Sequence, residues 1–313
     1  MKFLFAHFPL DSNQIEGTEL PRFFASKGHQ VHSIFIKNSR KFIGKFLPNG
    51  SIINIQQTEL HDAYDVIICK SDSFQKYARQ YASESTKVIN ITPMGIASNL
   101  KGVTYGFIEN QLIKAPVQEM QEVFSTYHPW DQRKDQIITV ASIGTDKNQL
   151  EFIRFFDARS FPDWRLIFVG AIKSNDYAHQ MQKEMTAKKI DFEIIDAVDR
   201  RSLAKLLQES KLSALTTDPR PAQPYDPGPR VVFESIRAGT PCILSDLVMV
   251  HEGAKNFSFF YEHQNMSSFE IMMKRVSSTN LKNLSHSCYE YGSHFYTMQN
   301  ACNIAYNDIM KWC

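Results

Sequence analysis

The sequence predicts an α/β protein made of two doubly wound domains. The chain has 313 residues, which is more than a single hydrophobic core usually organises. Short apolar runs alternate with longer amphipathic stretches, as in parallel sheets that carry helices on both faces. This alternation occurs in two series, and a polar, proline-containing segment at residues 128–135 separates them.

The first series predicts five strands with helices between them. Ser71 is a preferred helix N-cap residue, and Phe74, Tyr77 and Tyr81 fall on one helical stripe after it. The expected strands are residues 2–8, 29–36, 51–55, 64–69 and 87–91, and the expected helices are residues 18–26 and 71–82.

The second series predicts a further doubly wound unit. Its last helix ends at Gly239, a residue that commonly terminates helices. We therefore expect domains at residues 1–130 and 136–285, with a C-terminal helix at residues 286–313 that packs back on the first domain. The expected strands are residues 136–141, 164–169, 192–195, 212–215 and 241–244, and the expected helices are residues 147–156, 176–188, 202–209 and 231–238.

Composition excludes several classes of protein. Hydrophobic residues make up 43% and charged residues 22% of the chain, which are ordinary globular values. The 35 basic and 33 acidic residues leave a net charge of +2, so we expect no nucleic-acid partner. The five cysteines form no Cys-x-x-Cys pair and the ten histidines show no ligand spacing, so we expect no metal site.

The N-terminus does not have the pattern of a signal peptide. Its apolar run meets Pro9 and Asp11 before it reaches the usual length, and no segment approaches 18 uninterrupted apolar residues. The sequence therefore predicts a cytoplasmic location.

The most informative segment is residues 215–246, which predicts a strand, a proline-rich loop, a short helix and another strand. With Pro229 in the first helical turn, the free amides of residues 228–232 would face a pocket and could bind a diphosphate. Glu234 could accept two hydroxyl hydrogen bonds from a ribose, and Asp226 could contact the sugar beyond the diphosphate. Alternatively, Glu234 is a solvated helix residue and Asp226 a turn former.

The spacing Asp226-x7-Glu234, followed by small residues, Gly239 and Pro241, resembles the Glu-x7-Glu hallmark of glycosyltransferase family 4, the retaining GT-B transferases. Other segments are similar to further motifs of that family. They are Ile138-Thr-Val-Ala-Ser-Ile-Gly-Thr-Asp-Lys147-Asn, Leu166-Ile-Phe-Val-Gly170, Ala197-Val-Asp-Arg-Arg-Ser-Leu203, Glu16-Gly17-Thr18 and Gly28-His29-Gln30-Val31.

The resemblance implies a GT-B fold, in which two Rossmann-like domains face each other across a cleft. The first domain would bind the acceptor and the second the nucleotide sugar, with a UDP- or GDP-sugar as donor and no cofactor. No Asp-x-Asp metal motif is required, so the resemblance implies a metal-independent hexosyl transfer.

The resemblance also implies roles for particular residues. Asp226, Glu234 and Lys147 would be catalytic: Glu234 would bind the ribose hydroxyls, Asp226 the donor sugar, and Lys147 the diphosphate. Val198 would lie near the base. Further donor contacts would come from Ser142, Gly228, Arg230 and Val231.

This chain departs from the family pattern at three positions. Ser142 stands where the family has an arginine after a strand, Asp226 stands where it has its first glutamate, and Asn148 stands where it has a glycine after the lysine. Arg230, or Arg220 in the proline-rich loop, could supply the missing charge, although each could equally be a solvated surface arginine. An alternative function is therefore a catalytically degenerate GT-B homologue that acts as a binding or regulatory partner. A third is a sugar-nucleotide epimerase, which would need additional cleft carboxylates and histidines.

The acceptor side is less defined. Asn13, Glu16 and Gly17 follow the first strand and would line the cleft, although a polar turn would look the same. The segment from Lys37 to Leu47 interleaves four cations with four large apolar residues. It could lie on an anionic membrane surface, where lipid-linked acceptors reside, or form a solvated mobile loop. The expected acceptor is a glycan, a lipid-linked molecule or a small molecule.

Overall fold

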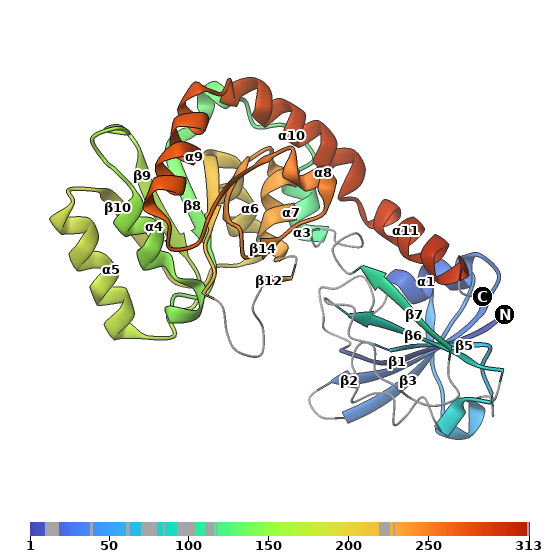
Figure 1. The fold of residues 1–313 in the computed structure, drawn as a ribbon. Helices are drawn as coiled ribbons and strands as arrows, with labels where there is room; N and C mark the ends of the chain where they lie inside the picture. The colour runs from blue at the N-terminus through green and yellow to red at the C-terminus, as the bar shows by residue number, and fades with distance from the viewer. Residues whose placement is uncertain are drawn as a thin grey trace. The chain divides into compact units, whose positions relative to one another are not determined.

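The chain divides into two compact units, Met1–Ala115 together with Thr297–Cys313, and Pro116–Tyr296. Each unit has its own sheet and core (Figure 1). The predicted α/β fold with two parallel-sheet domains is confirmed. The computed structural model describes residues 1–9, 19–37, 40–60, 63–69, 80–83, 85–92, 104–109, 116, 118–218, 226–227, 229–311 and 313.

The described part of the first unit contains a seven-stranded sheet in the order β4-β3-β2-β1-β5-β6-β7. Neighbouring strands are parallel except for β3, which pairs antiparallel with β2 and β4. The strands β3 and β7 were not predicted, and residues 71–79 of an expected helix lie outside the described residues. The strands are β1 (Lys2–Pro9), β2 (Gln30–Lys37), β3 (Arg40–Phe46), β4 (Ile52–Asn54), β5 (Val66–Cys69), β6 (Lys87–Thr92) and β7 (Thr104–Glu109).

Two helices from opposite ends of the chain, α1 (Glu19–Ser26) and α11 (Met298–Lys311), pack together in this unit. Phe24 of α1 lies edge-on to Phe3 of β1, with ring centroids 4.7 Å apart. Ala305 and Ile309 of α11 are fully buried in the same core. The end of the chain is therefore part of the first unit's hydrophobic core.

The segment expected either to contact a membrane or to form a mobile loop is largely strand β3. Ile43 and Phe46 are 7% and 2% exposed, because alternate side chains of a strand point into the two cores that flank the sheet. The interpretation as a loop is wrong for residues 40–46, and two of the four large apolar side chains are not available to a membrane. Phe42 is 36% exposed, and Lys45 is also exposed.

The second unit contains a parallel sheet in the order β10-β9-β8-β11-β13-β15. Strand order reverses between β8 and β11, and ligands of doubly wound sheets bind at such a switch point, outside the carboxyl ends of the strands. The strands are β8 (Lys134–Val140), β9 (Arg165–Val169), β10 (Asp191–Ile195), β11 (Ser210–Leu215), β13 (Cys242–Ser245) and β15 (Ser258–Tyr261). A separate short pair is formed by β12 (Asp226–Pro227) and β14 (Val248–Met249).

Helices cover both faces of this sheet (Figure 1). On one face α4 (Gln149–Phe155), α5 (Asn175–Ala187) and α9 (Met266–Ser278) share a core with Ile137 of β8. On the other face lie α3 (Gln118–Val123), α6 (Arg200–Glu209), α7 (Arg230–Ala238) and α10 (Leu281–Phe295). The remaining short helix, α8 (Glu252–Lys255), contacts α7.

The unit boundaries differ from the expected domains 1–130, 136–285 and 286–313. Residues 116–130 belong to the second unit, where Met120 and Phe124 are fully buried beside α6. Helix α10 also belongs to the second unit, because it packs against α7 through Cys288 and Gly292. The chain returns to the first unit only at Thr297.

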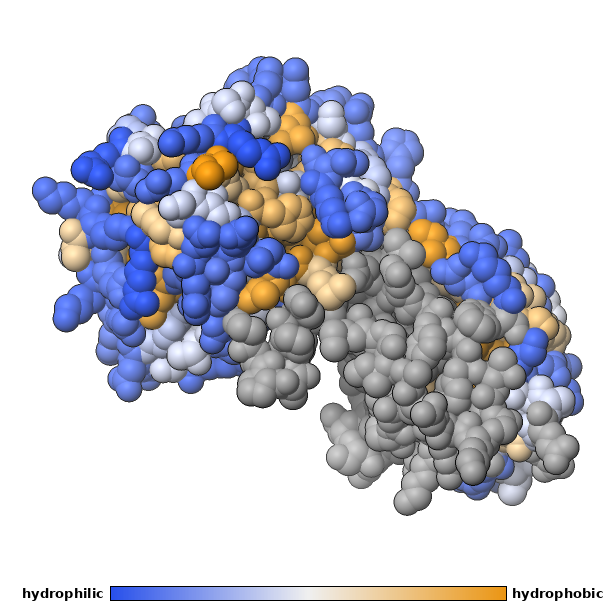
Figure 2. All heavy atoms as spheres, viewed as in Figure 1, coloured by the Kyte–Doolittle hydropathy of each residue, from blue (hydrophilic) through white to orange (hydrophobic). Residues whose placement is uncertain are grey.

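On the face that Figure 2 shows, the described residues present many hydrophilic side chains with apolar ones between them. Among the helices of that part of the chain, none is long and apolar enough to cross a membrane.

Candidate functional site

A cavity of about 410 Å³ lies at the carboxyl ends of β8, β9 and β11 in the second unit. The first residues of α6 and α7 flank it, so both helices direct their amino ends toward it. Six of the predicted residues line it: Ser142, Lys147, Val198, Arg230, Val231 and Glu234. The structure therefore brings together side chains from the segments after β8 and β10 and from α7 at the switch point of the sheet.

Lys147 is already paired with another predicted residue. Its Nζ lies 2.6 Å from Oδ2 of Asp226, and the two side chains are 25% and 12% exposed. The hydroxyl of Thr217 donates to the same carboxylate oxygen at 3.3 Å. The backbone N of Asp226 donates to the Leu247 carbonyl oxygen at 2.8 Å, which holds the residue in β12. Asp226 is therefore a strand residue with an ion pair, and the alternative that it only forms a turn is wrong.

Asn148 explains one departure from the family pattern. Its φ of 46° is in the left-handed region, where glycine is the usual residue and asparagine the next most tolerated. Its side-chain Nδ2 donates to Oε2 of Glu151 at 2.9 Å. The turn after Lys147 is therefore compatible with asparagine.

Glu234 is not a solvated helix residue, since only 3% of its surface is exposed. Burial raises the pKa of its carboxyl, and the positive charges of Arg200 and Arg230 oppose that rise. The nearest of these charges is Nη1 of Arg200, which lies 3.8 Å from Oε1. A buried carboxylate in a cavity is costly unless it gains hydrogen bonds, which hydroxyl groups of a ligand could supply.

Arg200 is a cavity residue that the sequence analysis missed. It is the first residue of α6, behind the N-cap Asp199, whose Oδ1 accepts a hydrogen bond from the Ser202 backbone N at 2.9 Å. The neighbouring Arg201 pairs instead with Glu122, away from the cavity. The sequence of residues 197–203 contains both arginines, and helix phase alone decides which of them faces the cavity.

Gly170 closes one side of the cavity. Its φ is 151°, and an added Cβ would lie 2.1 Å from the carbonyl oxygen of Ala141. The ends of β8 and β9 can approach this closely only with glycine at this position.

Four predicted site residues, Asn13, Glu16, Gly17 and Gly228, lie outside the described residues, and so does Arg220. In the part of the chain that is described, no group of three or more His, Cys, Asp or Glu side chains could hold a metal ion.

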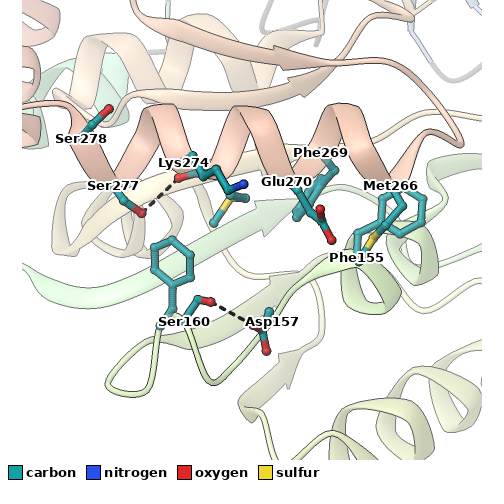
Figure 3. Close-up of a pocket in the computed structure, with 11 residues that line it drawn as sticks. Phe155, Asp157, Ser160, Met266, Phe269, Glu270, Lys274, Ser277 and Ser278 are labelled. Atoms are coloured by element: carbon teal, nitrogen blue, oxygen red, sulfur yellow. Dashed lines mark hydrogen bonds between the residues drawn. The ribbon is translucent and has the colours of Figure 1, made fainter.

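A second cavity, of about 550 Å³, lies between α9 and the segment after α4 (Figure 3). Its lining is mainly apolar, with Phe155, Phe269 and Met273, and Ser160 donates to Asp157 at 2.8 Å beside it. None of the predicted residues lines this cavity, so the cavity at the switch point is the candidate site.

Comparison with known proteins identifies the class. Residues 121–295 match the family model for glycosyl transferases group 1, which is more than half of the 313-residue chain. The chain therefore belongs to this glycosyltransferase family. No curated protein matches the sequence.

Several solved structures share the fold. A glycosyltransferase from Rickettsia africae ESF-5 has a TM-score of 0.65 at 11% identity, covering 99% of this chain and 98% of that one. The lipopolysaccharide outer core galactosyltransferase WaaB has a TM-score of 0.64 at 13% identity and 100% coverage of both chains. AviGT4, a glycosyltransferase involved in avilamycin A biosynthesis, has a TM-score of 0.63 at 13% identity, covering 100% and 98%. The predicted GT-B fold is confirmed, whereas membership of family 4 stays a prediction.

Proposed function

We propose that this protein is a retaining, metal-independent glycosyltransferase that transfers a hexosyl group from a UDP- or GDP-sugar to a glycan, lipid-linked or small-molecule acceptor. The observation that carries the proposal is the switch-point cavity, because it joins a buried carboxylate, fixed cations and two helix amino ends. These groups match the ribose and the diphosphate of a nucleotide sugar.

The donor would lie across the cavity in a defined direction. Glu234, 3% exposed, would accept the ribose hydroxyls, with Val198 beside the base. The diphosphate would lie at the amino end of α7, near Arg230 and Lys147, where the helix dipole favours negative charge.

Lys147 would act most strongly as the bond from the sugar to the diphosphate breaks. Negative charge grows on the leaving phosphate oxygen, so a fixed cation stabilises the transition state more than the bound donor. When Lys147 turns to the diphosphate, Asp226 loses its 2.6 Å partner and becomes available to the sugar. This charge compensation comes from side chains and helix amides, which is why the proposal includes no metal.

The acceptor would bind to the first unit, and the cytoplasmic location stays a prediction. WaaB is described as a lipopolysaccharide galactosyltransferase, which supports including hexosyl donors and lipid-linked glycans in the proposal.

The exposed Phe42 and Lys45 of β3 are the side chains proposed to contact an anionic membrane. The fraction of protein that sediments with phosphatidylserine vesicles should be smaller for the double variant Phe42→Ser, Lys45→Glu than for the wild type. An unchanged fraction would remove these residues from the proposal.

The function is tested by incubating the protein with UDP- and GDP-hexoses and following release of the nucleoside diphosphate without acceptor, with and without EDTA. We expect slow release from one donor, undiminished by EDTA, with water as the acceptor of the sugar. NMR early in the reaction, before mutarotation, should show that the released sugar keeps the donor's anomeric configuration. Binding without release would favour the degenerate homologue, and conversion of the sugar nucleotide into its epimer would favour the epimerase.

A further inference from the structure

A cluster of buried polar side chains lies beside Lys147 but does not line the cavity. Glu151 of α4 is 6% exposed, and its Oε1 has no hydrogen bond within the described residues. The same holds for the Tyr261 hydroxyl and both ring nitrogens of His263. Buried polar atoms without partners cost free energy, and in native proteins they are few.

These side chains approach one another closely even though their hydrogen bonds are not aligned. Nδ1 of His263 lies 2.9 Å from Oε2 of Glu151, and Nε2 lies 3.5 Å from Oδ1 of Asp218. Burial, and then the charge of Glu151, raise the pKa of the Tyr261 hydroxyl. The backbone N of His263 donates to Oδ1 of Asp246 at 3.0 Å. The segments that follow β11, β13 and β15 thus meet at His263, whose ring lies against the buried carboxylate of Glu151.

Glu151 is linked to the catalytic lysine through a single residue. Its Oε2 accepts the Asn148 side-chain Nδ2 at 2.9 Å, and Asn148 holds the left-handed turn directly after Lys147. On the other side of the turn, the Thr216 hydroxyl donates to the Lys147 carbonyl oxygen, and the backbone N of Asp218 lies 3.4 Å from the Asp146 carbonyl oxygen. The lysine turn is therefore fixed from two sides.

We propose that Glu151 and His263 are positioning residues that hold the turn of Lys147 in the conformation that meets the donor diphosphate. This inference rests on the proposed function of Lys147. Asparagine is strained in the left-handed region compared with glycine, so an anchored side chain is needed to keep the turn in place. A small displacement of a charged group in an active site is enough to lose much of its effect.

The affinity for a nucleoside diphosphate, divided by the affinity for its nucleoside, measures how strongly a cation contacts the diphosphate. We would titrate UDP and uridine, and GDP and guanosine, into the full-length protein by calorimetry. Lys147→Ala should lower the ratio for the preferred base, because only the diphosphate contacts this cation. Glu151→Ala and Asn148→Ala should each lower it by about tenfold, the factor given by a loss of 1.4 kcal/mol, with nucleoside affinity unchanged. Asn148→Gly should retain it, because glycine adopts the left-handed turn without an anchored side chain.

Three further variants separate positioning from general damage to the fold. Glu151→Gln keeps an acceptor oxygen for Asn148 and should retain most of the ratio. Arg154→Ala, on the same helix, removes an exposed ion pair with Glu184 and should not change it. In a Lys147→Ala background, Glu151→Ala should have no further effect, because the two residues act through one interaction.

Each outcome decides a separate question. A wild type that binds nucleoside diphosphates no better than nucleosides would refute the proposed function itself. A wild type with a clear preference that Glu151→Ala and Asn148→Ala both retain would overturn the positioning role alone. If Glu151→Ala does not fold, Asn148→Ala still tests the inference, because it removes the hydrogen bond and leaves Glu151 in place.

Discussion

Lys147 and Asp226 form an ion pair with 2.6 Å between Nζ and Oδ2. The pair is partly buried, so separating it without a replacement partner would be costly. A diphosphate supplies that replacement for the lysine, and sugar hydroxyls supply it for the aspartate. Donor binding would therefore exchange one set of charge partners for another.

Two cations that line the cavity, Lys147 and Arg230, are expected to contribute to turnover. Lys147→Ala should reduce turnover by about 10² or more, the scale seen when one preorganised transition-state contact is lost. If Arg230 supplies the second charge, Arg230→Ala should act similarly and Ser142→Arg should partly rescue it. Steady-state kinetics measure both effects, and an Arg230→Ala enzyme as fast as the wild type would eliminate Arg230.

Arg200 has a natural matched control in its neighbour. Arg200 lies 3.8 Å from Glu234, whereas Arg201 pairs with Glu122 outside the cavity. Arg200→Ala should weaken nucleotide binding several-fold in calorimetry, on the order of 1 kcal/mol for a lost contact to a charged group, and Arg201→Ala should not. Equal effects of both changes would mean that Arg200 acts on the surface charge and not on the ligand.

The raised pKa of Glu234 predicts a specific pH dependence. Burial raises this pKa, so the carboxyl stays protonated at pH values where an ordinary glutamate is ionised, and the protonated form accepts fewer hydroxyl hydrogen bonds. Donor affinity should therefore rise as the pH rises through the raised pKa. Glu234→Gln should abolish this dependence in calorimetric titrations across the range.

The same shift acts on stability with the opposite sign. The folded state binds more protons than the unfolded state between the ordinary and the raised pKa, so this group's contribution to the free energy of unfolding falls as the pH rises through that interval. Urea unfolding should show Glu234→Gln gaining stability relative to the wild type on going from acidic to neutral pH. A difference in the free energy of unfolding that stays constant with pH would mean that the pKa of Glu234 is not raised in the folded protein.

Much of the cavity could be predicted because Asp226, Glu234 and Lys147 occupy fixed spacings around strand ends. Arg200 could not be predicted, since Arg200 and Arg201 are identical in type and only helix phase separates them. The ion pair of Lys147 with Asp226 was also missed, because 79 residues separate the two along the chain. Pairings of this kind depend on the tertiary fold.

Helices α7 and α10 show how elements hold the site in place. An added Cβ at Gly292 would lie 2.7 Å from the Arg237 Cα and 2.8 Å from the Ile236 carbonyl oxygen. Buried Arg237 also donates to the Phe124 carbonyl oxygen at 2.7 Å and to the Ser293 hydroxyl oxygen at 3.0 Å. The helix that carries Glu234 is thus fixed along the side opposite the sheet.

Gly292→Ala should therefore destabilise the protein. Overpacking at a close helix contact costs about 1–3 kcal/mol, which exceeds the gain in helix propensity of about 1 kcal/mol. Ser287→Ala, at an exposed position of the same helix, is the control and should change little. A Gly292→Ala protein that is more stable in urea unfolding would show that the two helices are not in tight contact.

Strands with continuous apolar runs were easier to predict than strands with mixed composition. The strands β8, β9 and β11 have apolar runs that fit a buried parallel sheet. Strand β3 contains Arg40, Lys41 and Lys45, which suggested a solvated loop. Strand β7 contains Gly106, and an interior glycine weakens the strand signal.

At the scale of the whole molecule, the chain ends in the unit in which it began. Helix α11 contributes Ala301, Ala305 and Ile309 to the core around Phe3 and Phe24. The helical spacing of residues 281–313 was recognisable, but the change of unit at Thr297 was not, because both halves of the segment are amphipathic. The boundary depends on which partner each apolar stripe meets.

Ile309→Ala should destabilise the first unit selectively. The residue is fully buried, and such a truncation costs about 2–5 kcal/mol. Hydrogen exchange should become faster at the amides of β1 and stay unchanged at those of β8, and Gln299→Ala, at an exposed position, should change neither. Equal acceleration in both strands would contradict an independent core in each unit.

The most direct measurement for the donor site is a calorimetric titration of UDP- and GDP-hexoses into the wild type, Glu234→Ala and Glu209→Ala. Glu209 pairs with Lys134 at the amino end of β8. The cavity lies at the carboxyl ends of the strands, so Glu209 is a matched control far from it. We predict that one donor binds the wild type and Glu209→Ala equally, and binds Glu234→Ala at least about tenfold more weakly, with all three proteins folded. Equal donor affinity in Glu234→Ala, or its loss only together with the folded state, would contradict the assignment of this cavity as the nucleotide-sugar site.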